Sequence, residues 1–190
     1  YQATIRKKTN SPGRYKPQSG GHGQFGDVYL DIQPLPRGSG FNFSETIVGG
    51  VVPKQYIPGV ETGVREYLQH GPLGFPVVDV GVTLTNGSYH SVDSSEQAFK
   101  QAARVAMQQG MSDCQPVLLE PIALVEIFAP NEFTSKVLQL ISIRRGQILG
   151  YEGITDWQGW DQISAYLALS EMQDLIVELR SQTMGVGSFN

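Results

Sequence analysis

The stretch that decides half of the fold begins Ile122-Ala-Leu-Val-Glu-Ile-Phe128 and continues Asn131-Glu-Phe-Thr-Ser-Lys-Val-Leu-Gln-Leu-Ile-Ser-Ile-Arg144. The first part is apolar and short, and it predicts a buried strand. The second part repeats an apolar side chain every three or four residues, as one face of a helix does, at Phe133, Val137, Leu140 and Ile141.

The residues that follow complete a compact unit. Strands are expected at 147–154 and 161–169, a helix at 171–183 and a last strand from 187. The order β-α-β-β-α-β is that of a split-βαβ, ferredoxin-like domain. Its last strand stops short at Asn190, and the chain opens on a strand without Met, so we expect a piece of a longer protein.

Upstream of this unit the pattern differs, and we place a domain boundary after Leu119, giving domains 1–119 and 120–190. In the first domain we expect an exposed loop at 10–24, a turn at Asn86-Gly87 and no element at 110–116. Strands are expected at 1–8, 27–32, 41–48 and 77–85, and helices at 58–70 and from a capping box, Asp93-Ser-Ser-Glu96, to about 109. The fold class is therefore α+β, in two domains.

Composition narrows the class of protein. The single cysteine, Cys114, excludes a disulfide framework and a Cys-rich zinc site. No apolar run approaches the ~18 residues of a membrane span, and no apolar leader opens the chain. We expect a cytoplasmic protein without a membrane partner.

The net charge of −4 hides an asymmetry, because residues 1–22 carry a local charge of +5 and no acid. Its five cations are Arg6, Lys7, Lys8, Arg14 and Lys16. Such a basic segment favours an anionic partner, with nucleic acid the commonest. The alternative is a solvated strand and loop with no partner.

Residues 21–28, Gly-His-Gly-Gln-Phe-Gly-Asp-Val, match the glycine loop of protein kinases. The strand lysine, H-R-D and D-F-G motifs of kinases are absent from the sequence, as is the phosphate loop of GTPases and ATPases. Nucleotide binding at this loop is therefore kept only as a contrasting hypothesis. What its glycines provide is close backbone approach to a phosphate or a base edge.

Two further groups of residues have alternative interpretations. His90, Asp93 and Ser94 resemble a hydrolytic set, but helix capping explains the last two better, and the three histidines lack metal-ligand spacing. Arg144-Arg145-Gly146 ends a helix, where arginines suit the dipole and glycine the cap. A phosphate contact of these arginines is the other possibility.

Five strings occur in the order found in bacterial translation elongation factor G, and the resemblance covers the whole chain. They are Ser19-Gly-Gly-His-Gly-Gln-Phe-Gly26, Gly49-Gly-Val-Val-Pro-Lys-Gln-Tyr-Ile-Pro58, Gly87-Ser-Tyr-His-Ser-Val-Asp-Ser-Ser-Glu-Gln-Ala-Phe99, Leu119-Glu-Pro-Ile122 and Arg144-Arg-Gly-Gln-Ile148. The resemblance implies that 1–119 is domain IV, which is similar to domain 2 of ribosomal protein S5. It implies that 120–190 is domain V, of ferredoxin-like fold.

The function that this resemblance implies is tRNA–mRNA translocation during elongation. Domain IV of the family enters the decoding site of the small ribosomal subunit, and domain V faces the sarcin–ricin region of the large subunit. GTP and Mg²⁺ belong to an N-terminal domain of the parent GTPase, so this fragment is expected to have no catalytic residues, cofactor or metal. We also expect it to be a monomer.

The resemblance also implies which residues touch RNA. The tip that meets ribosome and tRNA comprises Gly20, Gly21, His22, Gly23, Gln24 and His90. The remaining candidates for rRNA contact are the cations Arg6, Lys7, Lys8, Arg14, Lys16, Arg144 and Arg145.

Departures from the family pattern keep other functions open. Family members commonly have arginine where this chain has His22, and histidine where it has Asp27, so an RNA-facing surface loses positive charge or polarity. In the second domain, F-G-Y-A-T-D-L-R-S is replaced by residues 173–181 and G-R-[GA]-S by residues 185–188. A paralogue acting in ribosome recycling or regulation is therefore an alternative, and a ribosomal protection protein ranks below it.

Overall fold

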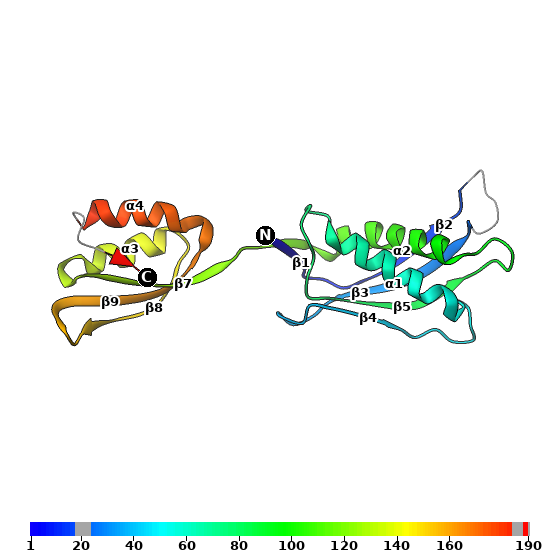
Figure 1. Cartoon of the computed structure of the whole chain (residues 1–190), viewed down its shortest axis with the longest axis horizontal. Coiled ribbons are helices and arrows are strands. Elements are labelled where there is room, and N and C mark those ends of the chain that lie inside the picture. Colours follow the sequence, from blue (N-terminus) through cyan, green and yellow to red (C-terminus); the bar gives the residue numbers. More distant parts are fainter. Residues whose placement is uncertain (18–23, 184–187, 190) are drawn as a thin grey trace. The chain divides into compact units, whose positions relative to one another are not determined.

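The computed structural model describes residues 1–17, 24–183 and 188–189. The chain divides into two compact units, Tyr1–Leu119 and Glu120–Asn190 (Figure 1). Each unit has its own hydrophobic core, built from a sheet and the helices that cover it. The structure is therefore mixed α and β in two domains.

The first unit is built on a four-stranded sheet in the order β2-β3-β5-β4. Its elements are β2 (Thr9–Tyr15), β3 (Gly26–Pro34), β4 (Phe41–Glu45), α1 (Ile57–Gln69), β5 (Val80–Ser88) and α2 (Glu96–Met111). The two helices lie together on one face of the sheet (Figure 1). Among the described strands of this sheet, only β4 and β5 pair in parallel, and α1 lies between them in the chain.

The prediction of a loop at 10–24 is wrong for residues 10–15. They belong to strand β2, Thr9–Tyr15, at the edge of the sheet. Pro12 is tolerated there because an edge strand leaves one side of its ladder unpaired. Gly13 lets the strand approach α2, since a Cβ at this position would overlap the carbonyl oxygen of Ala102. The buried Ser11 Oγ donates to the carbonyl of Ala106 at 2.7 Å. Close packing on a helix, rather than solvent exposure, explains these small residues.

The prediction that residues 110–116 contain no helix or strand is also wrong in part. Helix α2 extends to Met111, a short 3-10 turn covers Ser112–Cys114, and β6 (Pro116–Leu119) follows. Strand β6 pairs antiparallel with β1 (Gln2–Ile5), which is shorter than expected, in a separate two-stranded ribbon. The pairing joins residues more than a hundred positions apart, which no local pattern reveals.

The turn expected at Asn86-Gly87 is wrong because both residues lie inside β5, paired with Tyr29 and Val28 of β3. The register shifts between Tyr29 and Leu30, which identifies a β-bulge at this point. Gly87 is needed for close approach instead, since a Cβ there would overlap the carbonyl oxygen of Asp27.

Three boundaries differ from the predictions, the first two for local reasons. Strand β5 begins at Val80 rather than residue 77, because Asp79 has a left-handed backbone with φ of +60°. Helix α2 is capped by Ser95, whose Oγ accepts from the backbone N–H of Ala98 at 3.1 Å, rather than by Asp93. The strand expected at 41–48 ends at Glu45.

In the second unit the ferredoxin-like prediction is confirmed. Its sheet has the order β10-β7-β9-β8, and both helices cover one face (Figure 1). The elements are β7 (Ile122–Pro130), α3 (Thr134–Ile143), β8 (Gln147–Ile154), β9 (Trp157–Ala168), α4 (Met172–Gln182) and β10 (Ser188–Phe189). Within the described residues, no helix is both long enough and apolar enough to cross a membrane.

Candidate nucleic-acid interface

Three connecting segments meet at one end of the first unit, where β2 and β5 end and α1 begins (Figure 1). We call the described part of this end the tip: residues 16–17, 24–25, 46–56 and 89–95. The backbone N–H of Phe25 donates to the carbonyl of Asp93 at 2.8 Å, and Tyr56 Oη donates to the carbonyl of Ser94 at 3.3 Å. Segments distant in the sequence are thereby tied into one surface.

His90 lies on the segment between β5 and α2 and is held by a compact turn. Its backbone N–H donates to Ser94 Oγ at 2.8 Å, and the N–H of Ser94 donates to its carbonyl at 3.1 Å. The imidazole Nδ1 is 3.3 Å from Asp93 Oδ2 and 3.4 Å from the N–H of Val92. The side chain is 57% exposed. A polar ring is thus presented to solvent on a fixed backbone.

Phe25 contacts two polar or charged side chains, one in the tip and one at the adjoining end of β2. Its ring lies edge to face against the His90 imidazole, and the Arg14 guanidinium lies 5.6 Å from its centroid. Phe25 also bridges to Ser94 in parallel, so its backbone is fixed as well. The sequence-based predictions missed Phe25, although it stands within the quoted motif beside Gln24.

Asp27 was expected on the RNA-facing surface, and its burial corrects this. The residue is 9% exposed. Its Oδ2 accepts a hydrogen bond from Ser88 Oγ at 2.7 Å, and its Oδ1 lies 3.9 Å from Arg14 Nε. The carboxylate joins the ends of three strands beneath the tip. The Asp27 carboxylate is therefore not part of the exposed surface of the tip.

The segment 46–56 is a third part of the tip that the site predictions left out. Gly49 and Gly50 have left-handed backbones, with φ of +69° and +67°. No atom lies within 4 Å of a Cβ built at either glycine, so this backbone is open on that side. Lys54, which follows, is exposed. In the sequence, two consecutive glycines followed closely by a lysine are the signal that could have identified this segment as part of the tip.

The structure separates the basic N-terminal segment into two groups. Arg14 and Lys16 lie at the tip end of β2 and are exposed, as is Gln24. Arg6, Lys7 and Lys8 precede the other end of the same strand. A seven-residue strand spans about 20 Å, so the five cations do not form one patch.

In the second unit, both arginine candidates have intramolecular contacts. Arg145 forms ion pairs with Glu120 at 3.1 Å and with Glu171 at 3.3 Å. Arg144 Nη1 donates to the carbonyl of Leu140 at 3.4 Å, near the end of α3, whereas its buried Nε has no hydrogen-bond partner. The helix-end interpretation accounts for the Leu140 contact, and carboxylates already pair Arg145.

The four remaining tip candidates, Gly20, Gly21, His22 and Gly23, lie outside the described residues. So do Met184–Gly187, which hold most of the second departure from the family pattern. Within the described part of the chain, no group of three or more His, Cys, Asp or Glu side chains could hold a metal ion.

Comparison with known proteins identifies the family. A family model described as "Elongation factor G, domain IV" matches residues 1–115, and "Elongation factor G C-terminus" matches residues 117–190. The chain therefore belongs to the elongation factor G family, a class of translation factors. The resemblance found in the sequence is confirmed.

Two relatives cover the whole chain. An "Elongation factor G-like protein" of Synechocystis sp. (strain ATCC 27184 / PCC 6803 / Kazusa) is 70% identical over 189 residues. A crystal structure from Thermus thermophilus is 39% identical, with a TM-score of 0.79. The chain spans 28% of the length of each relative.

Proposed function

We propose that this chain is the ribosome-binding part of a translational GTPase and that its tip promotes tRNA–mRNA translocation in the decoding site. The observation that carries the proposal is His90, whose backbone is held by Ser94 and whose exposed imidazole lies against the ring of Phe25. A rigid, exposed hydrogen-bonding ring suits contact with ribose or base edges of RNA. Membership of the elongation factor G family supports this role.

In this proposal the chain itself is not an enzyme and binds no cofactor. GTP and Mg²⁺ are bound by a different domain of the parent protein, because this sequence contains no phosphate-binding loop. The 190-residue chain should therefore show no ribosome-dependent GTP hydrolysis. Turnover by a pure preparation would contradict this part of the proposal.

The test compares His90→Ala with His70→Ala in the full-length protein on purified ribosomes. Both histidines are exposed, but His70 lies at the end of α1, outside the tip. We expect His90→Ala to slow mRNA movement while single-turnover GTP hydrolysis stays near that of the wild type, because the imidazole acts on RNA after the GTPase domain has docked. His70→Ala should change neither rate. Unchanged mRNA movement in His90→Ala would refute the proposed role.

A second function, ribosome recycling or regulation by a paralogue, has one specific observation in its favour. The 70% identical relative is itself described as "Elongation factor G-like". The same variants distinguish the functions when subunit splitting is measured beside mRNA movement. A full-length protein that splits subunits and moves no mRNA would favour the paralogue.

A further inference from the structure

A basic groove lies at the end of the first unit opposite the tip, where β3 ends and β2 begins. Arg6, Lys7 and Lys8 line it together with Gln33 and Pro34, around an open space of about 500 Å³. All five residues are exposed. Seven residues of β2, about 20 Å of strand, separate this groove from the tip.

The backbone of the three cations is fixed. The N–H groups of Arg6 and Lys7 both donate to the carbonyl of Cys114 at 3.0 Å, and Cys114 is buried. Lys8 leads directly into β2, whose first residue, Thr9, pairs with Ile32 of β3. The three side chains therefore extend from a fixed backbone beside the end of β3 rather than from a free terminus.

Among the described residues, none of the three cations lies within 4.0 Å of a carboxylate in an ion pair. The nearest acid on the exposed face of β3, Asp31, instead accepts a hydrogen bond from Asn10 Nδ2 at 2.6 Å. By contrast, Arg65, Lys100 and Arg104 on α1 and α2 each form an ion pair with Glu61 or Glu66. Within the described part of the chain, the cations of the groove therefore have no ion-pair partner, whereas those on the helices do.

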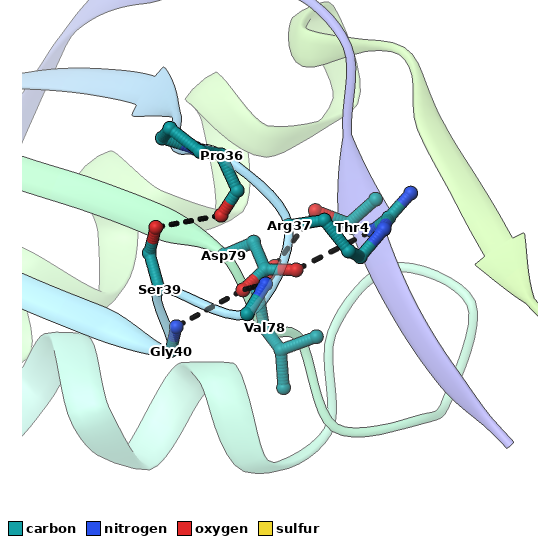
Figure 2. A network of polar contacts seen from close by, with 8 residues as sticks. Thr4, Pro36, Arg37, Ser39, Gly40, Val78 and Asp79 are labelled. Carbon is teal, nitrogen blue, oxygen red and sulfur yellow. Dashed lines mark hydrogen bonds and ion pairs between the residues drawn. The ribbon is translucent and has the colours of Figure 1, made fainter.

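The adjoining surface holds a further cation, which is already paired with a carboxylate. Arg6 also lines a second, smaller pocket of about 220 Å³, which Arg37 shares. Figure 2 shows Arg37 beside Thr4 and directed at Asp79, with which it pairs at 3.4 Å. Arg6 therefore stands between a compensated cation and the two uncompensated lysines.

We propose that this groove binds the phosphodiester backbone of RNA, as a contact separate from the tip. Adjacent cations without ion-pair partners, carried on a fixed backbone, favour successive phosphates. The Gln33 amide can hydrogen-bond to ribose or phosphate oxygens. The groove offers no aromatic side chain, the usual anchor of a protein partner. The proposal goes beyond the tip's function, because it requires neither His90 nor a ribosome.

The test measures binding of a fluorescent oligouridylate, about 20 nucleotides long, to the 190-residue chain by anisotropy, over a series of salt concentrations. The variant R6Q/K7Q/K8Q is compared with R65Q/K100Q/R104Q, which removes the same number of positive charges, three, from helices α1 and α2. Thermal melts verify that both variants are folded. We expect the groove variant to bind about 100-fold more weakly at about 0.1 M salt, since each contact to a single strand contributes about 0.7 of a decade there.

The groove variant should also reduce the slope of log K against log salt by about 2, while the helix variant changes affinity less than about 3-fold. Equal weakening in both variants would overturn the proposal, because net charge alone would then explain binding. Displacement of the RNA by polyglutamate at matched charge concentration would overturn the choice of RNA in favour of an acidic protein.

A tip variant, Lys16→Gln with His90→Ala, keeps the two proposals apart. We expect it to leave most of the oligouridylate affinity intact, because this probe needs only the groove. If the tip variant abolishes binding and the groove variant does not, the groove proposal fails while the tip proposal stands.

Discussion

The ring of Phe25 lies 6.3 Å from the imidazole of His90, centroid to centroid, at an interplanar angle of 61°. This edge-to-face contact joins the residue after the glycine-rich segment to the exposed histidine of another loop. Because Phe25 is fixed by its backbone bond to Asp93, the contact gives the imidazole a preferred position. The tip is therefore organised before any partner binds.

A double-mutant cycle with Phe25→Leu and His90→Ala should measure this contact directly. We expect a coupling energy of about 0.5 kcal/mol between the two rings, the low end for aromatic pairs, because the imidazole is mostly exposed. Urea unfolding of the wild type, both single variants and the double variant gives the value. His90→Ala alone should cost no more than about 0.5 kcal/mol, because its ring is mostly exposed. A coupling near zero would mean that the rings are neighbours without interaction.

Substitution of Gly13 should show that β2 depends on close packing against α2. In Gly13→Ala the added methyl group would overlap the Ala102 carbonyl oxygen and the Ala106 side chain. Overpacking of this kind costs about 1–3 kcal/mol or more. The matched control is Gly153→Ala, since no atom lies within 4 Å of a Cβ there. Chemical denaturation that finds equal stability in the two variants would contradict the close approach.

Asp79 should make the first unit sensitive to acid. Its Oδ1 accepts from the N–H of Gly40 at 3.0 Å (Figure 2). The same oxygen accepts from the N–H of Gly38 at 3.1 Å. The Gly40 hydrogen bond, with those of Gly38 and Arg37, lowers the pKa of Asp79, and burial opposes this. A lowered folded-state pKa means that the carboxylate stabilises the fold above its unfolded pKa of about 3.9. That stability is lost as the pH falls through the folded pKa.

The variant Asp79→Asn should therefore lower the free energy of unfolding at about pH 7 by about 1–3 kcal/mol. It should also flatten the loss of stability below about pH 4. Asparagine tolerates the left-handed backbone, so strain is not the cause. Glu61→Gln, which removes an exposed carboxylate paired with Arg65, should cost under about 1 kcal/mol. Denaturation curves of both variants from about pH 2 to 7 provide the measurement, and an unaltered acid limb in Asp79→Asn would exclude this assignment.

Cys114 should be unreactive in the folded protein. Burial, with a smaller contribution from the neighbouring Asp113, raises the pKa of its thiol to about 11. At about pH 8 only about one thiol in a thousand would then be ionised, and the thiolate is the reactive form. A disulfide exchange reagent should react slowly with the native chain and rapidly in denaturant, at one thiol per chain. Fast reaction of the native chain would show that this part of the first unit opens readily.

Local patterns were sufficient where one face of an element meets a nearby partner. The ferredoxin-like order followed from residues 122–189, because each helix repeats an apolar face and packs on strands adjacent in the chain. The strand Gln147–Ile154 has the predicted bounds. The quoted strings also carried the family, since they depend on residue identity rather than on geometry.

The amino-acid sequence by itself determined the family, the fold of the second unit and the exposed position of His90. Tertiary structure alone decided that Thr9–Tyr15 is a strand, that β1 pairs with β6, and that Asp27 lies beneath the tip. It also divided the basic segment between the tip and the groove. The physical reason is that these features depend on contacts between distant residues. Small residues such as Gly13 predict a loop when the sequence is considered alone, but here they allow a strand to pack closely against a helix. Periodicity measures which side of a segment is apolar, but not which other segment covers it.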